Sequence, residues 1–276
     1  MSVGRSQLAI AIEALRSLHD GDRGVAAAAA CGDEAIPLLR DLLFQREPSG
    51  LFETRRRAVE ALASLRAYDV LIEFLESRAD VADPVERVGE DAVINSAALA
   101  LRSGRDPRVF RLLASLAARR RSLSGVVAAL GEFRAVEAIP YLVDALAEDE
   151  SRAQAEAALR NIGPSARDAL VSAARCDPAT GGRESESRLR QRRSALALLV
   201  EMGIPPDVWS RLRETMDDQD PRLRLLACQL CLGAAPQSER EAAVRRLNHL
   251  RFKVDSFLRM DIERCLADYA EKARET

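Results

Sequence analysis

The spacing with the clearest chemical potential is Cys228-x-x-Cys231, a thiol pair of the kind that binds zinc or exchanges disulfides. With Cys265 and His249 it could make up a zinc set. Cys231 and Cys265, however, fall where a recurring helical pattern carries alanine or leucine in other copies, and a buried thiol fills such a position as a small apolar side chain. We interpret these cysteines as core residues, and we predict neither a metal site nor a cofactor.

Established catalytic motifs are missing from the sequence. It contains no G-x-G-x-x-G, Walker A, G-x-S-x-G or H-E-x-x-H segment. Its two histidines, His19 and His249, stand far apart, and its carboxylates are spread at the spacing of solvent-exposed helix faces. We therefore predict that the chain is not an enzyme.

The arginines form three clusters, at 55–57, 119–121 and 188–193. Concentrated positive charge on one face would favour nucleic acid. The chain as a whole carries 41 Lys+Arg against 43 Asp+Glu, a net charge of −2, with 4% aromatic residues and one tryptophan, Trp209. We interpret the clusters as solvated faces offset by neighbouring glutamates, and nucleic-acid binding through them remains the alternative function.

The elements that must position these residues follow from an internal repeat. The pattern Arg-x-x-Ala-x-x-(Ala/Leu)-Leu recurs in strong and weak copies, and its first residue stands at positions 23, 55, 94, 123, 152, 192, 224 and 259. Apolar residues at i, i+3, i+6 and i+7 form one stripe along a helix. A period of thirty to forty residues is typical of stacked helical pairs. We predict about eight such pairs.

A second amphipathic segment precedes several copies of the pattern, at 35–43, 70–76, 109–117, 138–146 and 166–174. Pro37 and Pro140 stand at the same early position in two of these segments, where a proline costs a helix little. Asp220-Pro221 is typical of an N-cap followed by the first helical residue. No stretch alternates like a strand, so the predicted fold class is all-α, an α-solenoid of stacked helical pairs.

We expect one repeat domain over 1–276, with an N-terminal cap at about 5–31 and a C-terminal cap at about 236–272. In the last helix, Phe257, Leu258, Ile262 and Leu266 are predicted to face inward and the charged residues outward. No apolar run approaches the roughly 20 residues of a membrane span, and no signal-peptide core forms at the N-terminus. With five scattered cysteines, the expectation is a soluble, cytoplasmic chain with reduced thiols and no membrane partner.

The segment 138–173 resembles the HEAT-repeat family, in particular its short bacterial form, also called the phycobilisome-lyase-type repeat. It carries the first-helix proline, an acidic turn, R-x-x-A-x-x-A-L and the closing Gly163. The segment 216–230, MDDQDPRLRLLACQL, is similar to the family's D-x-D-P-x-V-R turn, with leucine in place of valine. The resemblance implies a right-handed superhelix that binds other proteins.

Three functions are found among related repeat proteins. Deoxyhypusine hydroxylases need repeated His-Glu pairs for iron, and this chain has no His-Glu dipeptide. HEAT-like DNA glycosylases combine an arginine-lined concave face with tryptophans and a catalytic aspartate. A nucleic-acid-binding function of this chain would therefore be DNA-glycosylase-like, with the arginine clusters on the concave face. Bilin lyases share the repeat type but leave no recognisable chromophore-pocket signal in this sequence, so a bilin-lyase-like function ranks third.

The predicted function is that of an adaptor or scaffold for another protein. Longer spacings place insertions at 77–87 and 176–187, and such loops gather on one edge of a repeat array. A third insertion, 44–53, stands at the equivalent turn of the preceding repeat and is expected to expose Phe44 and Phe52. The candidate partner-binding residues on and near them are Phe44, Phe52, Arg56, Arg57, Arg183, Glu184, Arg190 and Arg193. The arginines at the repeat position are predicted to form a structural ladder between layers: Arg23, Arg55, Arg152, Arg192, Arg224 and Arg259.

Overall fold

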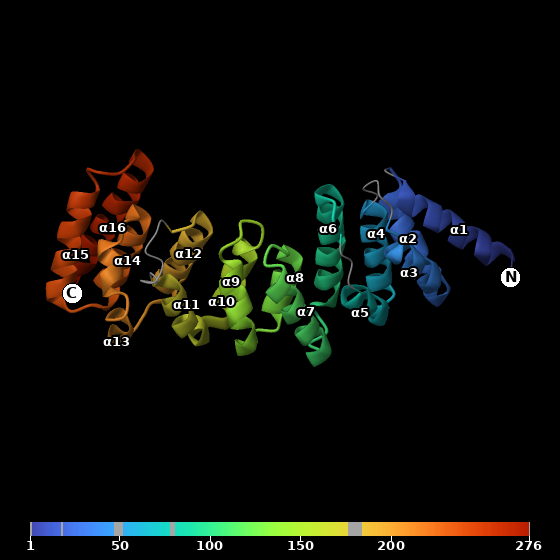
Figure 1. Cartoon of the computed structure of the whole chain (residues 1–276), viewed down its shortest axis with the longest axis horizontal. Helices are drawn as coiled ribbons and strands as arrows, with labels where there is room; N and C mark the ends of the chain where they lie inside the picture. Colours follow the sequence, from blue (N-terminus) through green and yellow to red (C-terminus); the bar gives the residue numbers. More distant parts are fainter. Residues whose placement is uncertain (1, 18, 47–51, 78–80, 176–183, 276) are drawn as a thin grey trace. The chain divides into compact units, whose positions relative to one another are not determined.

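A computed structural model describes residues 2–17, 19–46, 52–77, 81–175 and 184–275. In these ranges the chain forms α-helices and short 3-10 segments and no strand, which confirms the all-α prediction. The chain divides into two compact units, Met1–Phe133 and Arg134–Thr276. Figure 1 labels the helices of both units in chain order. The prediction of one continuous domain stays a prediction.

Unit 1 is a stack of helical pairs. Within each pair the helices contact each other, and the second helices of successive pairs also contact one another, in the order α2, α4, α6 and α8. The helices of the unit are α1 (Ser2–Arg16), α2 (Gly21–Ala30), α3 (Ile36–Phe44), α4 (Phe52–Ser64), α5 (Tyr68–Glu76), α6 (Pro84–Leu101), α7 (Pro107–Arg119) and α8 (Ser124–Glu132), with the 3-10 segment η1 (Gly32–Ala35) before α3.

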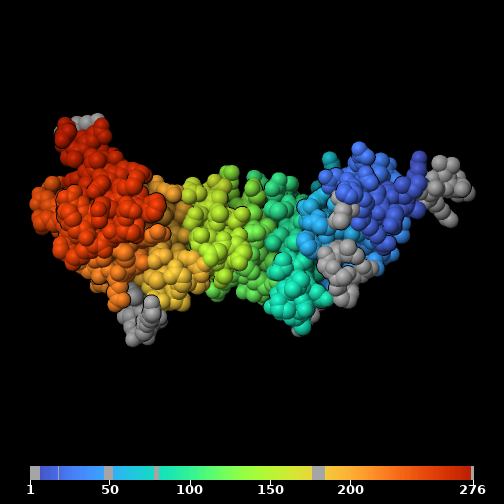
Figure 2. Space-filling view, turned by 90° about the horizontal axis from the view of Figure 1, so that it is seen from above, coloured from blue at the N-terminus to red at the C-terminus, as the bar shows by residue number. Residues whose placement is uncertain are grey.

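Unit 2 repeats this arrangement, with α10, α12, α14 and α16 in successive contact. Within each unit, the colours of the space-filling view follow one another in chain order (Figure 2). Its elements are η2 (Val136–Ala138), α9 (Ile139–Ala145), α10 (Arg152–Ile162), η3 (Gly163–Ala166), α11 (Arg167–Ala174), α12 (Glu186–Met202), α13 (Pro206–Trp209), η5 (Arg213–Asp217), α14 (Pro221–Ala234), α15 (Gln237–Leu250) and α16 (Ser256–Glu275).

The repeat pattern lies on the second helix of each pair, as predicted, with position 123 directly before α8. Small residues on this stripe are fully buried, for example Ala58 and Ala61 on α4. A close approach of one backbone to another occurs at Gly125, where a Cβ atom would lie 2.5 Å from the backbone oxygen of Asn95 on α6. The Gly125 N–H also donates to Asn95 Oδ1 at 2.9 Å. Small residues thus let neighbouring layers pack backbone against backbone.

Several second helices begin at an Asp-Pro step. The Oδ1 atom of Asp220 accepts hydrogen bonds from the N–H groups of Arg222 and Leu223 at 3.0 and 2.9 Å, which confirms the predicted N-cap. Asp83 caps α6 in the same way and Pro84 is its first helical residue. The predicted loop 77–87 is therefore wrong at its end, because residues 84–87 form the first turn of α6.

The two terminal caps stay predictions, and the last helix differs from the expectation at one residue. On α16, Leu258 and Ile262 are buried, but Phe257 is 78% exposed and does not face inward. Phe257 is the second residue of the helix, before the stripe that Leu258 and Ile262 define. Over the part of the chain described, no helix is both long enough and apolar enough to cross a membrane.

Candidate functional site

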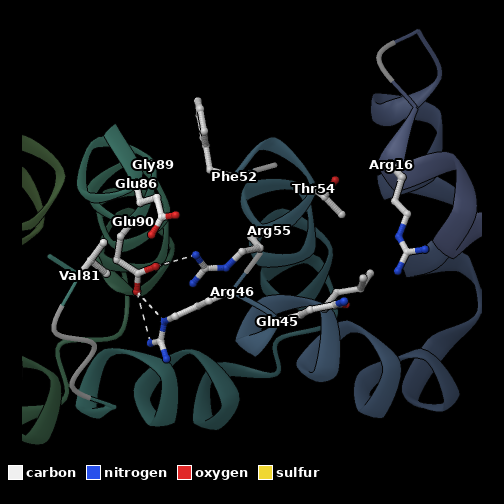
Figure 3. Close-up of a pocket in the computed structure, with 11 residues that line it drawn as sticks. Arg16, Gln45, Arg46, Phe52, Thr54, Arg55, Val81, Glu86, Gly89 and Glu90 are labelled. Carbon is white, nitrogen blue, oxygen red and sulfur yellow. Dashed lines mark hydrogen bonds and ion pairs between the residues drawn. The ribbon is translucent and has the colours of Figure 1, made fainter. Parts of the chain in front are cut away.

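Two of the three predicted insertions end at one pocket in unit 1. The segment 44–53 contributes Gln45, Arg46 and Phe52 to its lining, and the segment 77–87 contributes Val81 and Glu86. Helices α4 and α6 form the remaining wall together with the end of α1, and the cavity has a volume of about 90 Å³ (Figure 3). This volume holds a few water molecules or the end of one side chain.

A carboxylate shared by two arginines dominates the pocket. Glu90 on α6 is 4% exposed. Its Oε2 accepts a hydrogen bond from Arg55 Nη1 at 2.6 Å, and its Oε1 lies 3.4 Å from both Nε and Nη2 of Arg46. The two guanidinium groups approach Glu90 from different elements, Arg55 from α4 and Arg46 from the chain after α3 (Figure 3). One negative charge therefore faces two positive charges.

Several contacts fix the Arg55 side chain, but not all of its hydrogen-bond donors have a partner among the described residues. Its side chain is 9% exposed, its Nε donates to the Leu43 carbonyl at 2.8 Å, and its guanidinium carbon lies 5.5 Å from the centre of the Phe74 ring. Its Nη2 is buried and has no hydrogen-bond partner among the described residues. A buried donor without a hydrogen bond destabilises the folded state, so this nitrogen marks an unfilled hydrogen-bonding position in the pocket.

The pocket also has an apolar side. Leu42, Phe52 and Val81 line it, and Gly89 on α6 lies directly beside Phe52. A Cβ atom at position 89 would lie 3.1 Å from the Phe52 Cβ, so a larger residue there would push Phe52 into the cavity or fill it. The pocket therefore combines positive charge with an apolar wall, which suits a ligand with both properties.

The corresponding arginine of unit 2, Arg192 on α12, is saturated. Its Nε donates to the Ala174 carbonyl at 3.0 Å, as Arg55 does to Leu43. Its Nη1 donates to Glu184 at 2.7 Å and its Nη2 to Asp218 at 2.5 Å. Hydrogen bonds to Asp218 and Glu184 raise the pKa of Arg192 even though burial acts to lower it. The same repeat position thus has two carboxylates in unit 2 and one in unit 1.

The predicted partner-binding residues of unit 1 separate into two groups. Phe52 lines the pocket, but Phe44 is half-buried and its ring stacks edge-on against Phe74, with the centroids 5.8 Å apart. Arg56 pairs with Glu53 and Glu60 on its own helix. Arg57 donates to the carbonyls of two residues at the end of α1, Leu15 at 3.0 Å and Ser17 at 2.6 Å. These contacts correct the expectation that both phenylalanines are exposed.

Three of the predicted residues of unit 2, Glu184, Arg190 and Arg193, form ion pairs within this chain. Glu184 accepts from Arg192, Arg190 pairs with Asp149, and Arg193 donates to Asp220 at 2.5 Å. Arg183 lies outside the described residues. The structure therefore gives Glu184, Arg190 and Arg193 partners inside the unit.

The remaining predicted ladder arginines differ in their surroundings. Arg23 is exposed and lies 3.5 Å from Asp20, and Arg152 donates to Asp149 at 2.7 Å. Arg259 donates to the Arg251 carbonyl at 3.0 Å. The Nε of Arg224 is buried and has no hydrogen-bond partner among the described residues. Only Arg55 and Arg192 make the buried bond from Nε to the preceding helix.

Three of the cysteines, Cys228, Cys231 and Cys265, lie in unit 2 together with His249 and Trp209. Cys228 and Cys231 are buried on α14, and burial raises their pKa values to about 12 and about 11. Cys228 and His249 line a second hollow of about 400 Å³, in which Arg246 pairs with Asp217. Trp209 is buried and its N–H donates to Glu239 at 2.7 Å. No cluster of three metal-ligating side chains occurs within the described ranges.

The sequence did not single out the charged lining residues Arg16, Arg46, Glu86 and Glu90, although Arg46 and Glu86 lie within the predicted insertions. Arg55 was among the arginines predicted to be purely structural. One signal was available, because Arg55 and Glu90 directly follow the two insertions at 44–53 and 77–87. The glycine at position 89, in the interior of a helix, was a second signal of close approach.

Comparison with known proteins shows no matching family model and no matching curated protein. Among solved structures, the chain is similar to human deoxyhypusine hydroxylase in complex with glycerol, with 16% identity, a TM-score of 0.36 and 98% of each chain covered. It is also similar to an engineered protein, with 15% identity, a TM-score of 0.31, 95% of this chain and 98% of that chain covered. The stacked helical pairs of each unit fit a HEAT-like fold.

Proposed function

We propose that this chain is a non-catalytic adaptor of the HEAT-repeat type that binds another protein, and that the pocket between α4 and α6 is its docking site. The observation that carries the proposal is the meeting of two insertions, 44–53 and 77–87, at one pocket with a buried, incompletely bonded arginine. Insertions in repeat proteins are tolerated in loops, and those loops frequently form the binding edge. A cytoplasmic location belongs to the same proposal.

The arginine clusters support a protein partner over nucleic acid. Phosphate binding requires side chains that are free to reach the backbone of the nucleic acid. In the cluster 55–57, Arg55 binds Glu90, Arg56 binds two glutamates and Arg57 binds carbonyls of α1. At 188–193, Arg190, Arg192 and Arg193 each bind a carboxylate of the chain. All of these guanidinium groups are therefore bonded within their unit, and all except Arg57 pair with a carboxylate.

Affinity capture from a lysate of the source cells tests the proposal when the bait is varied at the pocket. Gly89→Leu should fill the pocket, and Arg46→Glu should reverse an exposed charge at its rim without changing the core. Gly233→Leu is the matched control, because Gly233 lies on a helix of unit 2 with open space around it. Circular dichroism of each variant shows that the helices are kept.

We expect the wild type and Gly233→Leu to retain the same protein, and both pocket variants to lose most of it. Retention of that protein by Gly89→Leu and Arg46→Glu would remove the pocket from the proposal. Recovery that disappears after nuclease treatment would instead support the nucleic-acid alternative. Failure of the wild type to retain any protein above the level of the empty resin would overturn the adaptor function.

A further inference from the structure

We propose that the pocket binds a carboxylate side chain of an acidic peptide segment, with Arg55 Nη2 and Arg46 as its donors. This inference rests on the proposed function and names the chemistry of the partner. It starts from the Nη2 atom of Arg55, which is buried and lacks a partner among the described residues, on a side chain that is itself nine-tenths buried.

Arg192 shows which group is missing at Arg55. Both arginines use Nε to bond the carbonyl at the end of the preceding helix. At Arg192 the two remaining nitrogens each bond one carboxylate oxygen, from Glu184 and Asp218. At Arg55, Nη1 bonds Glu90 and Nη2 has no such partner in the described part of unit 1. A carboxylate from a bound peptide would complete at Arg55 the set of bonds that Arg192 makes within the chain.

The charge of the pocket favours a monovalent anion. Its lining includes three arginines, Arg16, Arg46 and Arg55, and two glutamates, Glu86 and Glu90. Arg16 pairs with Glu13 on its own helix, whereas Arg46 and Arg55 share Glu90. Among the described residues, the two arginines at Glu90 therefore carry one positive charge more than the carboxylate they share, which a single bound carboxylate neutralises. A guanidinium group binds the planar carboxylate with two parallel donors, and burial strengthens the attraction.

The other lining residues indicate what lies beside the carboxylate. Leu42, Phe52 and Val81 supply apolar surface next to the arginines. An acidic residue with an apolar neighbour in the peptide would therefore bury that neighbour while its carboxylate reaches Arg55. The cavity of about 90 Å³ admits the end of a side chain but not a folded element, so the ligand is a peptide segment.

Peptide pools test the inference on the full-length chain. Each pool consists of nine-residue peptides with blocked ends, degenerate uncharged flanks and one fixed central residue, which is Glu, Asp, Gln or phosphoserine. Fluorescence anisotropy gives the affinity of each pool. We expect the Glu and Asp pools to bind at least about tenfold more tightly than the Gln pool, as charge-assisted hydrogen bonds require.

Variants assign this preference to the pocket. Arg46→Ala should reduce the Glu-over-Gln preference several-fold, and Arg55→Lys should abolish it, because a lysine cannot bond Leu43, Glu90 and a ligand at once. Arg108→Ala is the matched control, because Arg108 is an exposed arginine of unit 1 that pairs with Glu76. It should leave the preference unchanged.

Glu47 provides a further control, since it stands eight residues before Arg55 as Glu184 stands eight before Arg192. Glu47 lies outside the described residues. We expect Glu47→Gln to leave the melting temperature unchanged and Glu184→Gln to lower it. An equal loss in both variants would assign the second carboxylate of Arg55 to this chain and overturn the inference.

Equal binding of the Gln and Glu pools, or binding of the phosphoserine pool alone, would also overturn it. If no pool binds while the wild type still captures a protein that Gly89→Leu loses, the carboxylate inference fails and the adaptor function stands. If neither pools nor cellular protein bind, both fail. The two proposals are therefore separable by experiment.

Discussion

Arg55 and Arg192 occupy the same position in their repeats and start from the same hydrogen bond, yet their surroundings differ. In unit 2 the two remaining nitrogens of Arg192 each meet a carboxylate, Glu184 before α12 and Asp218 before α14. In the described part of unit 1, Glu90 is the one carboxylate that Arg55 meets, and Arg55 shares it with Arg46. One position of the repeat therefore serves as a closed structural link in unit 2 and as the wall of a pocket in unit 1.

The hydrogen bonds that a buried arginine lacks indicate its role better than its burial does. Both side chains are at least nine-tenths buried. An arginine with every donor paired adds to the connection between layers, whereas one with a spare donor carries a desolvation cost that a ligand can relieve.

Removal of each guanidinium gives the largest expected effect. Arg192→Met leaves two carboxylates, Glu184 and Asp218, without their buried partner, and should lower the free energy of unfolding by about 3–5 kcal/mol. Arg55→Met leaves only Glu90, which keeps Arg46, and should cost about 1–3 kcal/mol. Urea denaturation followed by circular dichroism measures both. An Arg55→Met variant as unstable as Arg192→Met would contradict the comparison.

The position of α6 gives the next effect, because α6 supplies the single carboxylate bound by Arg55. Gly125→Ala places a Cβ atom against the backbone of Asn95 on α6, so one helix must shift. We expect a loss of about 1–3 kcal/mol, as for other overpacked sites. The control Gly233→Ala meets nothing within 4 Å and should stabilise its helix by about 0.5–1 kcal/mol. Equal effects of the two substitutions would show that the layers do not depend on close approach.

The N-cap aspartates give a smaller effect and a pH dependence. Asp220 caps α14 and also binds Arg193 of α12, whereas Asp83 caps α6 through N–H groups of its own helix. Asp220→Ala should therefore cost about 2 kcal/mol and Asp83→Ala about 1 kcal/mol. Thermal unfolding of both variants measures the difference. Equal losses would mean that the bond from Arg193 adds nothing.

The stability that Asp220 provides should also depend on pH. Burial acts to raise the pKa of Asp220, but hydrogen bonds from Arg193 and from the Leu223 N–H outweigh it, and the pKa lies below its ordinary value. The folded state then binds the proton more weakly than the unfolded state, so this stability is present above about pH 4 and is lost as the pH falls further. Asp220→Asn should flatten the loss measured between about pH 5 and pH 2. An unchanged slope would assign the acid sensitivity to other groups.

The helical pairs could be predicted from the sequence because burial itself produces the pattern. Apolar stripes such as Ala58, Ala61 and Leu62 must face a neighbouring layer, and their period fixes which segment is a second helix. The Asp220-Pro221 cap was predicted for an equally local reason. The sequence has the same Asp-Pro step at Asp83-Pro84, but the predicted loop 77–87 includes it. The predicted loop therefore covers the first turn of α6.

The pocket could be predicted only in part. Its location followed from the insertions, since Phe52 and Val81 both line it. The role of each arginine did not follow, because neighbouring residues on a helix point about 100° apart and the sequence does not show which direction meets the pocket. Arg55, assigned to structure, faces the pocket, while Arg57, assigned to binding, contacts α1. The pair of Glu90 and Arg46 joins residues 44 positions apart, which no local pattern reveals.

The smallest effect concerns the arginine that follows each buried one. Arg193 bridges from α12 to the Asp220 cap of the next layer, whereas Arg56 pairs with Glu53 and Glu60 on α4 itself. The pKa of Arg193 is raised mainly by its hydrogen bond to Asp220. The pKa of Arg56 is raised mainly by its hydrogen bond to Glu53. We expect Arg193→Ala to cost about 1 kcal/mol and Arg56→Ala less than about 0.5 kcal/mol, because an exposed pair on one helix gains little.

A double-mutant cycle separates this bridge from simple loss of packing. Arg193→Ala combined with Asp220→Asn should show a coupling of about 1 kcal/mol, since each side chain loses the same partner. Arg56→Ala combined with Glu60→Gln should show a coupling of only a few tenths of a kcal/mol. High salt should reduce the second coupling more than the first, because Arg56 and Glu60 are the more exposed pair. Equal couplings would mean that unit 2 gains no additional link between layers from Arg193, and the contrast between the two units would then rest on Arg55 and Arg192 alone.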